Sequence, residues 1–477
     1  MSIVRGGGPR LAAGARAAAA GCVSIPEDER ARLDAIERDW LRPVAVDDAR
    51  PLTLAELQEA AIRRHPGLTA TFHRYRAALQ RIVLDGALDD PRVQFGVFLE
   101  SVETRVGSQE WKAGVSQAFP FWGKRDLRAE IALHDAHQLR EQLVEERLRI
   151  AKGVASAYWN LFDLETAIDV TERQVDLLDR LSESIEARFL SGTTPKADYL
   201  SILMEIDRRE SERRNLGRRR VDAIAALNAS LDRAPDAPLA VRFPAPDEVA
   251  ASAVDAATLV ERARDFGPVK VQAHRVLRQD AAVALAELGW YPDFSVGLDY
   301  IGTKALDVPA GMSVSGNGDD PTILGVGLNL PIWWDKNEAA IERAEQLLEA
   351  ERASRRSLIR DAERRAVAAV QRSLESEEDR ALYVERLLPR AEEKLELSEQ
   401  DYVGGLVDLD RLIAAEREVL ELRLLAVRAL ADRETALVEL DYLTGGALGR
   451  LVAVRPPGAE DVPEAEGREI RRNGGEP

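Results

Sequence analysis

Phe119-Pro120-Phe121-Trp122 and Leu330-Pro331-Ile332-Trp333 are two versions of one junction, in which an alternating apolar segment ends at a proline and a helical pattern follows. Other short stretches also occur twice, in the same order and a little over 200 residues apart. Solenoid repeats are only roughly 20–50 residues long, so this period predicts a duplicated domain instead. The other paired stretches are residues 65–67 with 267–269, 91–97 with 292–298, and 189–192 with 402–405.

The composition indicates long, solvated helices. Of the 477 residues, 31% are charged and only 5% are aromatic, which is typical of helices rich in Ala, Glu, Leu and Arg. The net charge of −18 argues against nucleic acid as a partner, because phosphate binding needs clustered Lys and Arg. A single cysteine excludes an intrachain disulfide, and no apolar run reaches the roughly 18 residues that predict a transmembrane helix.

The only cysteine, Cys22, follows Ala19-Ala20-Gly21 near the N-terminus. Small residues before a cysteine at this distance from the start are typical of a bacterial lipoprotein leader, in which the cysteine is acylated. We therefore expect a leader over residues 1–22, lipidation at Cys22 and a polar lead-in over residues 23–50. A chance cysteine in an alanine-rich leader remains the alternative.

Each copy contains two segments in which apolar and polar residues alternate. Sustained period-two alternation predicts a half-buried strand, and glycines on the polar face permit tight curvature. Residues 101–110 and 303–321, between the paired segments, are polar and rich in turn-forming residues, so we expect loops there. The apolar faces consist of Val93, Phe95, Val97 and Leu99; Trp111, Ala113, Val115 and Phe119; Phe294, Val296, Leu298 and Tyr300; and Leu324, Val326, Leu328 and Leu330.

A very long helical pattern follows each pair of strands. In the first copy it covers residues 122–189, and at about 1.5 Å per residue such a helix is on the order of 100 Å long. Apolar residues recur at intervals of three and four, as in coiled coils. Each long helix breaks once, at residues 191–195 or 404–405, and we expect the chain to return antiparallel from that turn.

These patterns divide the chain into a first repeat over residues 51–245, a second repeat over residues 246–450 and a tail over residues 451–477. Thr53 and Glu56 form a capping-box pattern, which predicts the start of the first helix of the first repeat. The tail contains several Pro, Glu and Gly residues, a composition typical of disorder.

Four strands with apolar faces suit a membrane only if several chains combine. Tilted membrane strands need roughly 9–11 residues, but known outer-membrane barrels begin at about eight strands, and lipid does not tolerate open sheet edges. Three copies would give twelve strands with every edge paired. The alternative, in which the strands are soluble hairpins resting on the helices, would make the protein a soluble coiled-coil scaffold.

In these features the chain resembles the TolC-like outer-membrane efflux channels, from about Leu52 to Gly446. The resemblance rests on the duplication, on the strand-to-helix junction over residues 117–125, and on two aromatic-x-x-Gly turns that Asp follows. The Gly123-Lys124-Arg125 junction and the leader are most similar to the branch that serves resistance–nodulation–division exporters, including heavy-metal exporters. The resemblance implies a mainly α fold with a small β part: a trimer with a twelve-stranded β-barrel in the bacterial outer membrane and an α-helical barrel across the periplasm.

The resemblance also implies the function and the partners. It implies a passive conduit for small molecules or metal ions, with no catalysis and no cofactor. The expected partners are two further copies of the chain, a periplasmic adaptor (a membrane fusion protein), an inner-membrane pump and the lipid of the outer membrane. The alternatives are the outer-membrane component of a type I protein secretion system and a soluble periplasmic coiled-coil scaffold.

The turns between the long helices are the expected contact with the adaptor, by resemblance. Acidic residues shortly after such turns narrow the periplasmic aperture in the family, and Asp198, Asp408 and Asp410 occupy these neighbourhoods. Asp198 lies six residues after Gly192, whereas Asp410 lies five after Gly405, so the choice between Asp408 and Asp410 stays open, as does an ordinary helix-start carboxylate. The expected adaptor contacts are Leu190, Ser191, Gly192, Thr193, Val403, Gly404, Gly405 and Leu406.

The sequence offers little for metal binding or catalysis. His134 and His137 are three residues apart, a spacing that can place two ligands on one helix face, but the pattern contains no third histidine or cysteine beside them. A solvated helix face is therefore the favoured interpretation. Five His, one Cys and three Met give few soft ligands, and no phosphate-binding loop or Ser/His/Asp arrangement stands out. We predict no metal, cofactor or catalytic site.

Overall fold

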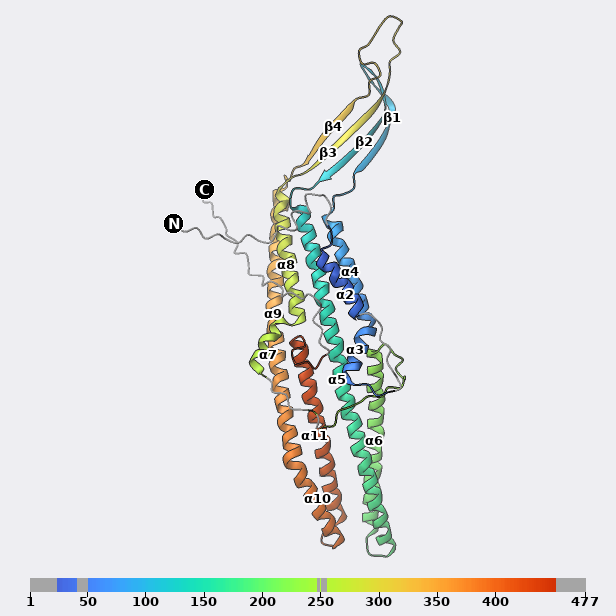
Figure 1. Cartoon of the computed structure of the whole chain (residues 1–477), viewed down its shortest axis with the longest axis vertical. Helices are drawn as coiled ribbons and strands as arrows, with labels where there is room; N and C mark the ends of the chain where they lie inside the picture. The colour runs from blue at the N-terminus through green and yellow to red at the C-terminus, as the bar shows by residue number, and fades with distance from the viewer. Residues whose placement is uncertain (1–23, 41–49, 247–248, 250–254, 452–477) are drawn as a thin grey trace, which may run out of the picture.

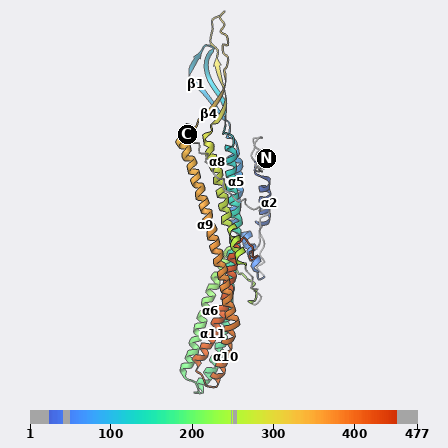
Figure 2. The ribbon, with the colours of Figure 1, turned by 90° about the vertical axis from the view of Figure 1, so that its left-hand side faces the viewer.

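The computed structural model describes residues 24–40, 50–246, 249 and 255–451. The molecule is long and narrow, with a small sheet at one end and two turns between long helices at the other end (Figures 1 and 2). It is mainly helical with one four-stranded sheet. The predicted fold class, a duplicated unit of helix, two strands and a long helical hairpin, is confirmed.

The two repeats have the same order of elements, and a further helix, α2 (Glu27–Trp40), precedes them. The first repeat consists of α3 (Leu54–Arg64), α4 (Pro66–Gly86), β1 (Arg92–Thr104), β2 (Gly107–Phe119), α5 (Lys124–Leu190) and α6 (Lys196–Ser230). The second consists of α7 (Ala256–Arg262), α8 (Gly267–Glu287), β3 (Asp293–Lys304), β4 (Thr322–Asn329), α9 (Trp334–Ala381), a π-helix (Leu382–Leu387), α10 (Leu388–Val403) and α11 (Leu409–Leu443).

The start of α3 has the predicted capping box. The backbone N–H of Glu56 donates to Thr53 Oγ1 over 3.4 Å, and the N–H of Thr53 donates to Glu56 Oε2 over 2.9 Å. These reciprocal bonds satisfy two of the backbone donors that a helix leaves open at its N-terminus. The next helix begins directly at Pro66, a residue whose fixed φ suits the first turn.

The sheet has the strand order β1-β2-β3-β4, and every neighbouring pair is antiparallel. The expected loop over residues 101–110 is wrong, because β1 continues to Thr104 and β2 begins at Gly107, which leaves a two-residue turn. Polar side chains do not prevent pairing when one face of the sheet is itself polar. The expected loop over residues 303–321 is correct except that β3 includes its first two residues.

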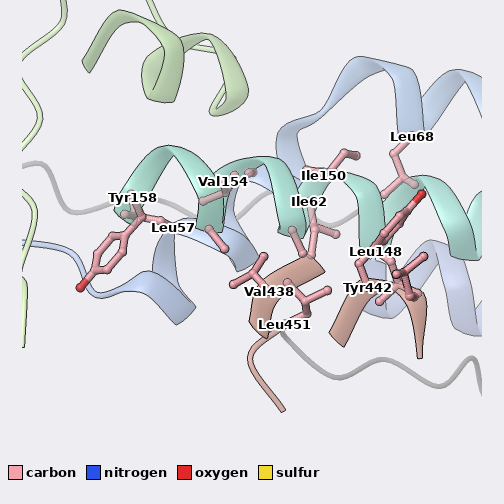
Figure 3. Packing of buried hydrophobic residues seen from close by; sticks show 14 of the residues in the cluster. Leu57, Ile62, Leu68, Leu148, Ile150, Val154, Tyr158, Val438, Tyr442 and Leu451 are labelled. Carbon is pink, nitrogen blue, oxygen red and sulfur yellow. The ribbon is translucent and has the colours of Figure 1, made fainter. Parts of the chain in front are cut away.

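The main core lies midway along the helices, where α3, α4 and α5 meet the end of α11 (Figure 3). Leu57, Leu68, Val154 and Val438 are fully buried there. Burying a side chain of this size contributes roughly 1.5–3 kcal/mol. Leu451, the first residue of the expected disordered tail, is also buried in this core, so that the ordered chain continues at least one residue further than expected.

The sequence analysis missed helix α2 in the expected polar lead-in. Its Ile36 and Trp40 are buried against the first repeat, and the guanidinium of Arg147 lies 4.6 Å from the centre of the Trp40 ring. The helix is highly charged, and its three buried apolar residues, Ala35, Ile36 and Trp40, are too few to give a clear periodic pattern.

The two long hairpins share a stripe of buried positions, with one shift in register. The side chains of Val154, Tyr158, Leu161 and Leu164 in α5 are buried, and so are Ala366, Val370, Ser373 and Ser376, each 212 positions later in α9. Beyond the π-helix, buried Leu178 and Ile185 correspond to buried Ala391 and Ser398, each 213 positions later. A π-helical turn holds one residue more than an α-helical turn, so the π-helix absorbs a one-residue insertion.

Cys22 and residues 452–477 lie outside the described residues, so lipidation and the disorder of the tail stay predictions. None of the helices in the described ranges combines the length and the hydropathy needed to cross a membrane.

Candidate functional site

The sheet exposes a continuous apolar face. The register aligns Val93 with Val115, Val115 with Leu298, and Leu298 with Leu324, so that the apolar residues of all four strands lie on one side. Leu324 is 72% exposed. Exposed apolar patches of this kind mark a surface that another phase or another chain covers. Further exposed residues of this face are Phe95, Val97, Val296, Tyr300, Val326 and Leu328.

The opposite face of the sheet is polar and carries the glycines. Lys112 and Asp299 lie on this face and form an ion pair with a distance of 3.0 Å. Gly114 pairs with Asp299, and a Cβ atom at Gly114 would lie only 2.1 Å from the Asp299 carboxylate. Glycine is therefore required at that position unless the carboxylate moves. A sheet with one apolar and one polar face fits a boundary between lipid and water.

The Gly123-Lys124-Arg125 junction fastens the first repeat to the second. Gly123 has φ 88°, a left-handed conformation that favours glycine. The Lys124 ammonium then donates to Asp293 Oδ1 over 2.8 Å and to the Tyr291 carbonyl over 2.9 Å. The backbone N–H of Phe121 also donates to Asp293 Oδ1. The junction thus fixes the angle at which the sheet meets the helices.

Aromatic side chains gather at this same boundary between sheet and helices. Trp122, Trp333 and Trp334 are 69–74% exposed, and Tyr291 is about half exposed. Phe121 stacks on Tyr291 with ring centres 4.4 Å apart. Exposed Trp and Tyr at the edge of an apolar strand band are typical of the interface between membrane and water.

The two turns at the far end have the same backbone geometry. Gly192 has φ 77° and Gly405 has φ 73°. The N–H of Thr193 donates to the Arg188 carbonyl, and the N–H of Leu406 donates to the Asp401 carbonyl. Both turns are therefore Schellman motifs, in which glycine supplies the left-handed residue. The glycines at these expected adaptor contacts have this role independently of any partner.

Large apolar side chains are exposed beside these turns. Leu190, Val403 and Leu406 are 70–78% exposed, whereas Ser191 and Thr193 make hydrogen bonds within the first turn. The two hairpins also contact each other: the Arg188 guanidinium lies 5.3 Å from the centre of the Tyr402 ring. Behind the turns, a small apolar cluster contains residues of both hairpins, namely Leu178, Ile185, Ile202, Leu409, Leu412 and Ile413.

The three candidate gate residues have different environments. Asp408 is the N-cap of α11, and its carboxylate accepts a hydrogen bond from the Arg411 N–H over 3.1 Å. Asp410 is exposed in the first turn of α11, and Asp198 is half-buried. Because the register beyond the turns is 213, the residue equivalent to Asp198 is Arg411, not an aspartate. The two turns therefore differ in charge.

A buried ion pair links the two hairpins above the turns, and the sequence analysis missed it. Glu205 of α6 is 1% exposed and accepts a hydrogen bond of 3.1 Å from Arg417 Nε of α11. Burial alone would raise the pKa of Glu205, but the hydrogen bonds from Arg417 and Arg209 outweigh it and lower that pKa. The pair has no local sequence signal, since the partners lie 212 residues apart.

The structure corrects the interpretation of His134 and His137 as a solvated helix face. Their side chains are only 15% and 18% exposed, and His274 of α8 lies against both of them. One ligand atom of each of the three residues lies within 4.8 Å of the others. The sequence analysis could not find this cluster, because the third histidine comes from the other repeat.

Comparison with known proteins assigns the chain to a family. The family model described as outer membrane efflux protein matches residues 57–233 and 267–446. The chain belongs to the outer membrane efflux protein family. The predicted resemblance to TolC-like channels is thereby confirmed, and the family is one of channels. The curated proteins contain no match to the sequence.

Solved structures of outer-membrane channels share the fold. VceC from Vibrio cholerae is 18% identical, with a TM-score of 0.69 over 82% of this chain and 96% of its own. The CmeC channel of Campylobacter jejuni is 12% identical, with a TM-score of 0.66 over 82% and 85% of the two chains. The open-state MtrE channel of Neisseria gonorrhoeae is 16% identical, with a TM-score of 0.65 over 87% and 96%.

Proposed function

We propose that three copies of the chain form one efflux conduit, in which twelve strands close a barrel in the outer membrane and the helices continue as a tube across the periplasm. The observation that carries the proposal is the sheet itself. Its outer face is apolar, its inner face is polar, and in the described chain β1 and β4 each have a strand partner on one side only. Lipid does not tolerate such edges, and three copies pair all of them.

The conduit is passive and serves small molecules or metal ions. The number of chains in the native assembly is tested first. Native mass spectrometry in detergent should give three chains, and a stable monomer that inserts into bilayers contradicts the proposal.

The apolar face of the sheet is tested by substitution. Val326→Arg, on the apolar face, should impair insertion into vesicles by roughly 2–4 kcal/mol. Ser295→Arg, on the polar face, is the matched control and should insert normally, because its charge meets water.

We infer that the two turns bind a periplasmic adaptor, which connects the conduit to an inner-membrane pump. Support comes from Leu190, Val403 and Leu406, which expose apolar surface beside rigid Schellman turns. Leu406→Glu should weaken adaptor binding by at least tenfold. Leu84→Glu, at an equally exposed leucine of α4, should leave binding unchanged. Equal effects of the two variants in surface plasmon resonance would contradict this role.

We assign the acidic gate to Asp410 rather than to Asp408, because the Asp408 carboxylate already caps α11. Three symmetry-related carboxylates in a narrow ring attract cations into the pore. Asp410→Asn should reduce cation preference in planar bilayers and relieve block by multivalent cations. Asp408→Asn, which keeps the cap, should change neither quantity. If only Asp198→Asn changes selectivity, the gate lies in the first hairpin.

We propose outer-membrane localisation with a lipid anchor at Cys22. The leader pattern supports the lipid anchor, and the exposed aromatic side chains at the edge of the sheet support the localisation in the membrane. Intact mass of membrane-extracted protein should show an acylated N-terminus at Cys22. A mature chain that begins after Cys22 would remove the anchor but not the conduit, because the strands supply their own apolar area.

A further inference from the structure

Three of the five histidines of the chain meet at one place. His134 and His137 lie three residues apart on α5, and His274 comes from α8 of the second repeat. The ring centres are 5.1–6.1 Å apart, and one nitrogen of each residue lies within 4.8 Å of the other two. The helix spacing of i and i+3 places the first two rings on one face, where both lie against the ring of His274 of α8.

Several ring nitrogens of this cluster are buried without a hydrogen-bond partner. They are Nδ1 of His134 and both nitrogens of His274, which is 4% exposed. A buried polar atom left unsatisfied costs roughly 1–3 kcal/mol, so the arrangement is unfavourable unless something occupies it. Burial away from water disfavours the charged form of an imidazole, so these nitrogens offer lone pairs to a ligand.

A buried carboxylate supports His137. Glu29 of α2 is 1% exposed, and its Oε1 lies 3.2 Å from His137 Nε2 and 2.9 Å from Arg140 Nη1. In the tautomer in which His137 Nε2–H donates a hydrogen bond to this carboxylate, Nδ1 carries the free lone pair. A carboxylate that accepts the second N–H of a histidine is the usual outer partner of a metal-binding imidazole, and it fixes the tautomer and the ring orientation.

We propose that His134, His137 and His274 form a binding site for one divalent first-row transition ion, of which Zn²⁺ is the best fit. Three neutral imidazoles suit Zn²⁺, Cu²⁺ or Ni²⁺, and three protein ligands leave a fourth, tetrahedral position for water. The ion would join α5 of the first repeat to α8 of the second, close to α2. Its role is to hold the two repeats together, which goes beyond the conduit function and is independent of the cargo.

The test uses the full-length protein in detergent after treatment with a chelator. Zn²⁺ titration calorimetry should give one ion per chain, and Co²⁺ as a substitute should show the strong visible absorption of a tetrahedral site. His274→Gln should abolish the Co²⁺ spectrum and weaken Zn²⁺ binding by at least a hundredfold. His73→Gln, at an exposed histidine of α4 outside the cluster, should bind like the parent.

Folding of the variants is checked by circular dichroism, and His134→Gln serves where His274→Gln fails to fold, because the His134 side chain is partly exposed. Zn²⁺ should also raise the midpoint of thermal unfolding of the parent and of His73→Gln, but not of His134→Gln. A parent protein that binds less than half an equivalent of Zn²⁺, or a His134→Gln variant that binds as tightly as the parent, overturns the proposal. Failure of this test leaves the trimer and bilayer results unaffected, because those do not depend on the ion.

Discussion

The two long hairpins have the same turn and share a stripe of buried positions, but they fill that stripe differently. The buried stripe of α5 contains Tyr158, Leu161 and Leu164, whereas the equivalent stripe of α9 contains Val370, Ser373 and Ser376. Smaller side chains bury less apolar area per turn and let helices approach more closely. Duplication therefore preserved the pattern of contact and not the size of the groups that make it, and we expect the second hairpin to depend more on polar contacts.

The largest expected effect concerns two equivalent ion pairs. Arg433 and Glu377 of the second hairpin correspond to Arg220 and Glu165 of the first. The side chain of Arg433 is 3% exposed and also contacts fully buried Glu434, whereas the side chain of Arg220 is 41% exposed. Arg433→Ala should lower the free energy of unfolding by roughly 3–5 kcal/mol, because it breaks a buried ion-pair network in which Glu377 loses this partner and Glu434 retains Arg450. Arg220→Ala should cost at most about 1 kcal/mol.

Urea unfolding of both variants in the same detergent, followed by circular dichroism, measures this difference. The double-mutant cycle Arg433→Ala with Glu377→Gln should give a coupling energy well above that of Arg220→Ala with Glu165→Gln. Equal costs of the two arginine variants would mean that the hairpins use their ion pairs in the same way, contrary to the comparison.

The apolar stripe gives the second prediction. Leu164→Ala removes a buried side chain and should cost roughly 2–5 kcal/mol. Ser376→Ala, at the equivalent position of α9, should change stability by less than about 1 kcal/mol, because little volume is lost. Thermal unfolding of the two variants is the measurement. A destabilisation by Ser376→Ala that matches Leu164→Ala would show that α9 is packed as tightly as α5.

Glu416 of α11 gives the third prediction, because the equivalent residue of the first hairpin is Leu203. Burial raises the pKa of Glu416 from 4.5 to about 7, repulsion by Glu399 of α10 adds to this shift, and Arg423 opposes it. The folded state therefore binds more protons than the unfolded state between these values. Stability from this group is full below pH 4.5 and is lost as pH rises through about 7, by about 3 kcal/mol.

Glu416→Gln should remove this pH dependence, so that stability at pH 8 approaches the value at pH 5. Glu418→Gln, whose carboxylate pairs with Lys394 and is about half exposed, is the control and should keep the parent's slope. Unfolding midpoints from pH 5 to pH 8 measure both. Stability profiles of the parent and of Glu416→Gln that run parallel over this range would show that Glu416 is ionised in the folded state.

The smallest expected effect tests the one-residue insertion at the π-helix. Deletion of Val384 together with Pro389→Ala should convert the segment to regular α-helix and keep both registers, at a change of less than about 1 kcal/mol. Deletion of Glu172, the equivalent position of α5, should be severe, because it rotates the rest of the helix by roughly 100° away from its buried stripe. Hydrogen exchange across α10 and the end of α5 reports both outcomes.

Much of this fold could be predicted from local patterns. The capping box at Thr53, the alternating strands and the unbroken α5 all follow from residues within a few positions of one another. The π-helix could not be predicted in this way. It precedes Pro389, which lacks an N–H for the carbonyl four residues earlier, but a proline alone equally predicts a kink or an end of the helix. Only alignment of the two buried stripes reveals the extra residue.

The site residues also fall into two groups, those that local sequence patterns predict and those that depend on contacts between the repeats. The turns near Gly192 and Gly405 are local, and their positions were predicted correctly. The gate, the adaptor contact and lipidation at Cys22 stay predictions. The histidine cluster and the pair of Glu205 with Arg417 each join residues from both repeats, so no spacing in the sequence indicates them. They depend on how the repeats dock, which local periodicity does not determine.

The difference in charge between the two turns has a consequence for stoichiometry. In the proposed assembly, each chain contributes two hairpins, so the ring of turns is sixfold in shape. It is only threefold in chemistry, because Asp198 of one turn alternates with Arg411 of the next. A partner that recognises backbone shape could occupy every position, whereas a partner that recognises charge could occupy every second one. The number of adaptor chains per conduit would therefore show whether the adaptor recognises the backbone shape or the charge of the turns.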